Sequence, residues 1–149
     1  MIAETDILAR LILAAVIGSA LGLERKMHHK PSGTRTNGLV CLGSALFTIV
    51  SMDFAGSGDP SRIAAGIVTG IGFLGAGTIF KTRNRVVGLT TAAEMWTVAA
   101  IGIAAGAGMY FTAIAAAVIV FMLLVQGKMV EKEVTKSTRR HHDKWGSWI

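Results

Sequence analysis

Four residues with oxygen-bearing side chains, two of them carboxylates, stand at the edges of long apolar runs. Glu24 closes the first run, Asn37 opens the second, and Thr91 and Glu94 open the fourth. Carboxylate, amide and hydroxyl oxygens suit hard cations such as Mg²⁺, which usually keeps several waters. These four residues are therefore candidate ligands of a cation site, with Mg²⁺ as the candidate cofactor. The alternative, which we favour, is an ion-pair network that holds helix ends together.

The stretch "GIGFLGAG", residues 70–77, has the glycine spacing of a dinucleotide-binding loop, and Glu94 follows where that motif places a ribose ligand. The motif requires a strand, a turn and a helix within a parallel-sheet unit. Here the glycines lie inside one apolar run, and strands do not alternate with helices along the chain. The pattern therefore does not indicate a nucleotide site. No Ser/His/Asp, Cys/His or paired-carboxylate arrangement predicts an enzyme.

The composition indicates a membrane protein. Of the 149 residues, 52% are hydrophobic and 16% are charged, against roughly 25% charged in soluble domains. A bilayer core requires about 20 helical residues, with a range of roughly 17 to 25. The apolar runs cover residues 7–23, 38–52, 63–80, 89–107 and 109–125. We expect an all-α polytopic fold in which residues 1–127 form five transmembrane helices and residues 128–149 form a short basic cytoplasmic tail.

The distribution of basic residues predicts how the helices are oriented. If all five runs cross the bilayer, every Lys and Arg except Arg10 and Arg62, out of 15, falls on one side. Basic residues are enriched in cytoplasmic loops. We therefore expect the N-terminus outside and the C-terminus in the cytoplasm. Because the basic residues lie in separate blocks rather than on one solvated face, we expect a lipid bilayer and no nucleic acid as partner.

Further polar residues share the expected cytoplasmic end with the candidate ligands. They are Arg25, Arg35, Thr36, Lys81 and Thr90. A carboxylate at membrane depth needs a partner, and we expect Arg35 or Arg25 to pair with Glu94. Thr90 is expected to cap the fourth helix by accepting a backbone hydrogen bond. On the outer side, Asp53 is a candidate first contact for cations, and a plain solvated loop is the alternative that we favour.

The glycines of the third run predict close helix packing. Gly66 and Gly70 form a GxxxG pair, and Gly72, Gly75 and Gly77 add further small residues. We expect this run to be the centre of the bundle and to contact several neighbours. The same glycines could instead break the helix between Gly72 and Gly77 and expose carbonyls to an ion. Because symmetric dimers are the commonest assembly, we also expect a homodimer through segments rich in Gly and Ala.

Three stretches resemble the signatures of the MgtC/SapB family of bacterial inner-membrane proteins. They are "GLERKMHHKPSGTRTNGLVCLGSALF", "AAGIVTGIGFLGAGTIF" and "VVGLTTAAEMWTVAAIGIAAGAG". The resemblance implies five membrane helices, a periplasmic N-terminus, a multi-pass place in the inner membrane, and a link to growth in low magnesium and to survival inside hosts. It also implies that Glu24, Arg35, Asn37 and the Gly72/Gly75 region are signature positions of the family. Longer members continue into a soluble ACT-like domain, for which this tail is too short, and small or apolar residues are commoner at the position of Glu94.

Two functions follow from the residues and the resemblance together. The first is binding or transport of Mg²⁺ through the polar site at the inner leaflet. The second is a non-transporting regulator whose small-residue helix faces dock another membrane complex, such as ATP synthase. A small multidrug exporter fits poorly, because that plan has four spans and a carboxylate in the middle of the first.

Overall fold

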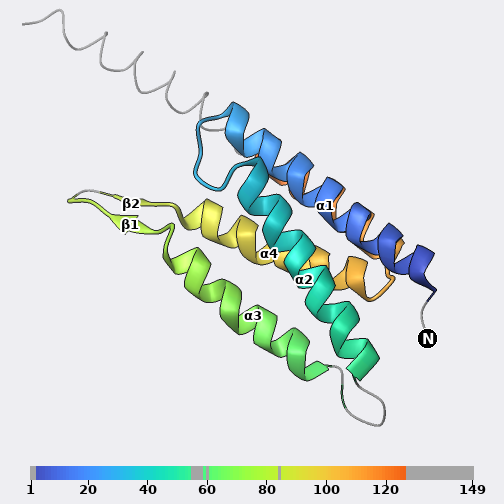
Figure 1. The fold of residues 1–149 in the computed structure, drawn as a ribbon. Helices are drawn as coiled ribbons and strands as arrows, with labels where there is room; N and C mark the ends of the chain where they lie inside the picture. Colours follow the sequence, from blue (N-terminus) through green and yellow to red (C-terminus); the bar gives the residue numbers. More distant parts are fainter. Residues whose placement is uncertain (1–2, 55–58, 60, 84, 127–149) are drawn as a thin grey trace, which may run out of the picture.

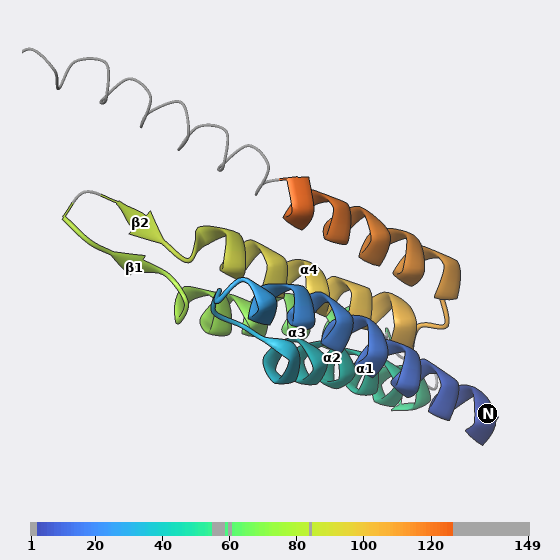
Figure 2. The same ribbon diagram turned by 90° about the horizontal axis from the view of Figure 1, so that it is seen from above.

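The computed structural model describes residues 3–54, 59, 61–83 and 85–126, and it is helical apart from one small hairpin. The labelled helices are α1 (Glu4–Met27), α2 (Thr34–Phe54), α3 (Ser61–Ala76) and α4 (Leu89–Gly106), as Figure 1 shows. A fifth helix, Tyr110–Gln126, follows α4 after a tight turn and is drawn in orange in Figure 2. Each predicted apolar run therefore contains one helix, and the all-helical architecture is confirmed. The predicted tail, residues 128–149, lies outside the described residues.

Three of the helices are long and apolar enough to cross a membrane. These are α1, α2 and α4, whereas α3 and the fifth helix are apolar but shorter. Large apolar side chains point outward, including Leu39, Phe73 and Phe111, which are 69%, 83% and 86% exposed. Large apolar side chains exposed on several helices are typical of a surface that contacts a membrane or another protein. The surface thus agrees with a helical bundle that faces lipid.

Helix α3 ends before the third apolar run does, at Ala76 rather than at residue 80. At its start, Asp59 accepts hydrogen bonds from the hydroxyl and backbone N–H of Ser61, at 2.7 and 2.9 Å, and these bonds lower the pKa of the Asp59 carboxyl. The helix stays regular through Gly72 and ends at Ala76, where a turn at Gly77 begins. The break between Gly72 and Gly77, which was the alternative to packing, is therefore a helix end rather than a kink.

A short antiparallel hairpin connects α3 to α4. Strand β1 (Phe80–Lys81) pairs with β2 (Val86–Val87), with Phe80 opposite Val87. Gly88 follows with φ of 95°, and a Cβ on it would lie 1.8 Å from the carbonyl oxygen of Thr78. A glycine is required there on both counts. In Figure 1 the hairpin extends beyond the helices at the end where α1 finishes and α4 begins.

The centre of the bundle is formed by α2 and α4, not by α3. Each of these two helices packs against α1 and α3 as well as against the other. The main core cluster joins apolar side chains of α1, α2, α4 and the fifth helix, and no α3 residue belongs to it: Ala14, Ile17, Leu21, Cys41, Ala45, Val98, Ile101, Ala105 and Ala113. The prediction that the third run is central is therefore wrong.

The glycines predicted to pack helices are largely open within this chain. A Cβ added to Gly66, Gly70 or Gly72 would meet no atom within 4 Å, and one on Gly75 would make only ordinary contact with Ala92 at 3.5 Å. A Cβ on Gly77 would approach only the preceding turn of its own segment. Gly66, Gly70, Gly72 and Gly77 therefore do not bring α3 close to its neighbours, and Gly75 lies at an ordinary contact with α4. A packing role for these glycines against a second copy stays a prediction.

Two other GxxxG pairs produce the close helix approach. On α1 a Cβ at Gly18 would lie 2.5 Å from the carbonyl oxygen of Asn37, and on α4 a Cβ at Gly102 would lie 2.3 Å from that of Cys41. Their partners Gly22 and Gly106 are equally close to the backbone of the α2 region. Small residues permit such approach of membrane helices, where packing and polar contacts replace the hydrophobic effect. Helix α2 is thus held between two glycine faces.

A polar contact joins α1 to the turn between α4 and the fifth helix. The Arg10 guanidinium donates to the carbonyl oxygen of Gly106 at 2.7 Å and pairs with Asp6 at 2.6 Å. The Tyr110 hydroxyl donates to the same carboxylate. Gly108, with φ of 78°, leaves room for the guanidinium, because a Cβ there would lie 2.7 Å from Nη2. This contact fixes the expected outer end of the bundle.

Candidate functional site

A buried ion pair joins α1 to α4 at the opposite end of the bundle. Arg25 Nε lies 2.8 Å from Glu94 Oε2, and the two side chains are 6% and 1% exposed. Of the two arginines expected as partners of Glu94, the structure places Arg25 there, while Arg35 is exposed. A charge pair so deeply buried is costly to desolvate unless further hydrogen bonds complete it.

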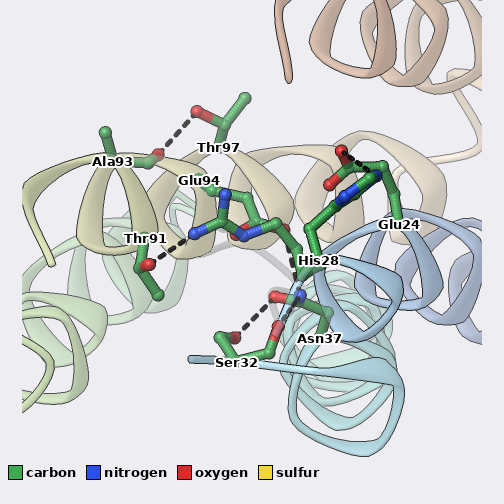
Figure 3. Close-up of polar contacts among 9 residues, drawn as sticks. Glu24, His28, Ser32, Asn37, Thr91, Ala93, Glu94 and Thr97 are labelled. Carbon is green, nitrogen blue, oxygen red and sulfur yellow. Dashed lines mark hydrogen bonds and ion pairs between the residues drawn. The ribbon is translucent and has the colours of Figure 1, made fainter. Parts of the chain in front are cut away.

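Hydrogen bonds from α2 and α4 complete the pair, as Figure 3 shows for the labelled side chains. Arg25 Nη2 donates to Thr91 Oγ1 at 2.5 Å, and Asn37 Nδ2 donates to Glu94 Oε1 at 3.0 Å. Asn37 itself is fully buried. We call Arg25, Asn37, Thr91 and Glu94 the polar cluster. The cluster joins α1, α2 and α4 near one end of each helix.

The loop before α2 fixes the orientation of Asn37. The Ser32 hydroxyl donates to Asn37 Oδ1 at 3.0 Å, and Asn37 Nδ2 donates to the Ser32 carbonyl oxygen at 2.8 Å. Ser32 has φ of 62°, a left-handed conformation within a Pro-Ser-Gly turn. Sequence reasoning missed Ser32; the turn residues around it were the available signal.

Three of the four predicted ligands meet in the polar cluster, and the fourth lies beside it. Glu24 is buried on α1, with its carboxylate 4.0 Å from His28 Nε2. The Thr91 hydroxyl accepts from Arg25, and the amide nitrogen of Asn37 faces Glu94. Within the described part of the chain, no group of three or more His, Cys, Asp or Glu side chains is placed to hold a metal ion. The arrangement matches the alternative of an ion-pair network, and cation binding by these residues stays a prediction.

The predicted cap of the fourth helix is wrong. The residue before the first turn of α4 is Gly88, and no side chain caps the helix. Thr90 is exposed within that first turn. The left-handed Gly88 is needed to bring the hairpin back beside Thr78, so the cap position is taken by a residue that has no side chain.

The remaining polar residues are placed at the surface. Thr36 and Lys81 are exposed at the same end as the polar cluster, and Asp53 is exposed near the end of α2 at the other. None of the hydrogen bonds of the cluster includes them. A role for Asp53 in first contact with cations stays a prediction.

An apolar helical bundle with a buried polar cluster at one end defines the class as a helical membrane protein. The sequence profile of the MgtC family matches residues 11–133. The chain belongs to the MgtC family.

Proteins from several bacteria are similar in sequence to this chain. The chain is 48% identical over 128 residues to "Putative magnesium transporter YhiD" of Escherichia coli (strain K12), a match that covers 80% of this chain and 59% of that protein. It is 47% identical over 107 residues to "Protein MgtC" of Brucella abortus (strain 2308), a match that covers 72% of this chain and 45% of that protein. An uncharacterized protein of Haemophilus influenzae is 39% identical over 149 residues, and that match covers 93% of this chain and 63% of that protein. The chain thus spans about half to two thirds of these relatives' length, and no solved structure matches it.

Proposed function

We propose that this chain is a five-span protein of the bacterial inner membrane that takes part in magnesium homeostasis by binding or transporting Mg²⁺. Membership of the MgtC family and the printed name of the YhiD relative support the link to magnesium. The single structural observation that carries the proposal is the buried Arg25–Glu94 pair. Ionisable side chains inside a membrane bundle are expensive and usually functional.

The placement of charge supports an orientation with the polar cluster at the cytoplasmic end. The hairpin, with Lys81, Arg83 and Arg85, lies at the same end as the C-terminal turn of α1 with its Arg25 and Lys26.

The short helices need a thin bilayer or flanking residues to span the membrane. At 1.5 Å per residue, the 16 residues of α3 cover about 24 Å against a core of about 30 Å. Local thinning of the bilayer absorbs a difference of this size at modest cost.

Single-cysteine labelling tests this orientation. The lone cysteine, Cys41, is buried, and we take Cys41→Ala as background, with Asp53→Cys or Arg83→Cys added. We expect a membrane-impermeant maleimide, in cells whose outer membrane is permeabilised, to label Asp53→Cys, and to label Arg83→Cys only after lysis. Labelling of both from outside, or in the reverse order, would contradict the five-span arrangement.

The geometry suggests how Mg²⁺ would act at the polar cluster. Glu94 is neutralised by Arg25, so a cation that binds this carboxylate must compete with the guanidinium. A partly hydrated Mg²⁺ would do so through the Glu94 carboxylate and the Thr91 hydroxyl, because Mg²⁺ retains several waters. Asn37 would have to turn its amide to offer the oxygen that now accepts from Ser32. Exchange of Arg25 for the cation would break the ion pair that joins α1 to α4 at this end of the bundle. The proposed activity therefore depends on the charge of Glu94.

A flux assay in proteoliposomes with a fluorescent Mg²⁺ reporter tests this dependence. We expect the wild-type chain to carry flux above protein-free vesicles, and Glu94→Gln to lower it by at least about tenfold, because loss of even an outer-shell partner of a metal ligand costs about that much. Glu4→Gln is the matched control, because Glu4 is an exposed carboxylate at the other end of α1. Unchanged flux in Glu94→Gln, with a lower melting temperature, would leave the cluster a purely structural role.

The alternative is a non-transporting regulator that docks another membrane complex. One observation speaks against direct cation binding at Glu94, namely that Arg25 already occupies the position facing this carboxylate. The same assay separates the two functions. Absence of flux in folded wild-type protein that retains a membrane partner in a pull-down would support the regulator.

A further inference from the structure

An apolar groove of about 820 Å³ runs between α2 and α3 on the outside of the bundle. Leu39 and Phe47 of α2 and Ile63 and Leu74 of α3 line it, and all four are exposed. Two of the five glycines that were expected to pack α3, Gly66 and Gly70, form part of this lining. A Cβ on Gly43, Gly66 or Gly70 would meet nothing within 4 Å. The missing side chains therefore widen the groove instead of drawing helices together.

An arginine lies at each end of this groove. Arg35 belongs to the first turn of α2 and Arg62 to the first turn of α3, and these consecutive helices run in opposite directions. Both side chains are exposed, and neither forms an ion pair with any residue that the structure describes. No acidic residue lines the groove. An apolar channel with a cation at its mouth is complementary to an acyl chain attached to an anionic headgroup.

We propose that the groove binds an anionic phospholipid of the cytoplasmic leaflet, with the headgroup phosphate on Arg35 and one acyl chain between α2 and α3. The lining of α2 extends from Arg35 to Phe47, a rise of about 18 Å at 1.5 Å per residue. Half of a bilayer core is about 15 Å, so the groove accommodates one leaflet's acyl chain. This inference goes beyond the proposed magnesium function and uses only its membrane orientation.

Charge disfavours a second copy of the chain in the same groove. A symmetric partner packed along α2 and α3 would need a carboxylate to neutralise Arg35 near the cytoplasmic end. Among the described residues, the carboxylates at that end are Glu24 and Glu94, and both are buried inside their own bundle. A lipid phosphate supplies the missing charge and is abundant at that depth. Basic residues near an anionic membrane surface gain attraction of this kind.

Native mass spectrometry of the full chain with phosphatidylglycerol or phosphatidylcholine in mixed micelles tests the proposal. We expect the wild-type protein to retain phosphatidylglycerol about fivefold more strongly, the ratio given by about 1 kcal/mol for one basic residue. Arg35→Gln is expected to abolish that preference. The double variant Gly66→Leu/Gly70→Leu fills the groove and is expected to lower retention of both lipids. Gly72→Leu is the matched control, since Gly72 is equally open on α3 but lies outside the lining.

Two results would overturn the proposal. One is unchanged preference for phosphatidylglycerol in Arg35→Gln. The other is a dimer peak that disappears in Gly66→Leu/Gly70→Leu while lipid adducts remain, which would assign the groove to a second copy. Neither result depends on Mg²⁺ flux, so failure of the lipid site and failure of the proposed function are distinguishable.

Discussion

Replacing Arg25 by methionine is expected to lower the free energy of unfolding by about 3–5 kcal/mol, the usual cost of removing one partner from a buried ion pair. Methionine fills the apolar part of the space, but it leaves the Glu94 carboxylate buried with a single hydrogen bond from Asn37. It also removes the donor to Thr91. Unfolding in mixed micelles with increasing SDS, followed by circular dichroism, measures the change.

A double-mutant cycle shows whether this cost comes from the unpaired charge. Arg25→Met/Glu94→Gln removes both charges, and we expect it to be more stable than Arg25→Met alone, since residues in direct contact are not additive. Arg35→Met is the control, because Arg35 is an exposed arginine at the same end of the bundle and surface changes usually stay within about 0.5 kcal/mol. A double variant no more stable than Arg25→Met would contradict the ion pair as the source of the effect.

Adding one methyl group at Gly102 is expected to destabilise the bundle, whereas adding one at Gly70 should not. The Gly102→Ala Cβ would lie 2.3 Å from the Cys41 carbonyl oxygen, which is backbone of α2 and cannot rotate away. Overpacking of this kind costs about 1–3 kcal/mol. At Gly70 the space is open, and alanine is favoured over glycine in a helix by up to about 1 kcal/mol.

The same unfolding assay compares these two variants, and opposite signs are the expected result. Similar destabilisation by both would mean that α3, and not the α2–α4 contact, is the tightly packed part of the bundle. Equal neutrality would mean that α2 and α4 lie further apart than described. The wild-type chain and the Gly43→Ala variant serve as references, because Gly43 is an open position on α2 as Gly70 is on α3.

The tight packing at these glycines also positions the candidate site. Gly18 of α1 faces the backbone of Asn37, the residue that donates to Glu94 across the bundle. Close approach of α2 to both α1 and α4 is what allows one amide to reach a carboxylate on another helix. Variants in the glycine contacts should therefore disturb the polar cluster even though they lie outside it.

The helices and the presence of a buried pair were predictable from the sequence, but their arrangement was only partly so. Apolar runs located each helix of the described part of the chain, and the cost of a lone carboxylate at membrane depth required a cationic partner for Glu94. The sequence left Arg25 and Arg35 as equal candidates, because both stand near helix ends. Only the packed structure turns Arg25 inward, toward Thr91 and Glu94, and leaves Arg35 at the mouth of a groove.

The choice of the central helix depended entirely on tertiary structure. Three GxxxG pairs occur in this chain, at Gly18/Gly22, Gly66/Gly70 and Gly102/Gly106, and nothing local distinguishes them. In a soluble protein the apolar side of a helix would identify its core face, but in a membrane the lipid is as apolar as the interior. The sequence therefore determined which segments are helical and which end carries the charged residues. Steric fit between backbones decided which glycines meet a neighbour and which remain open.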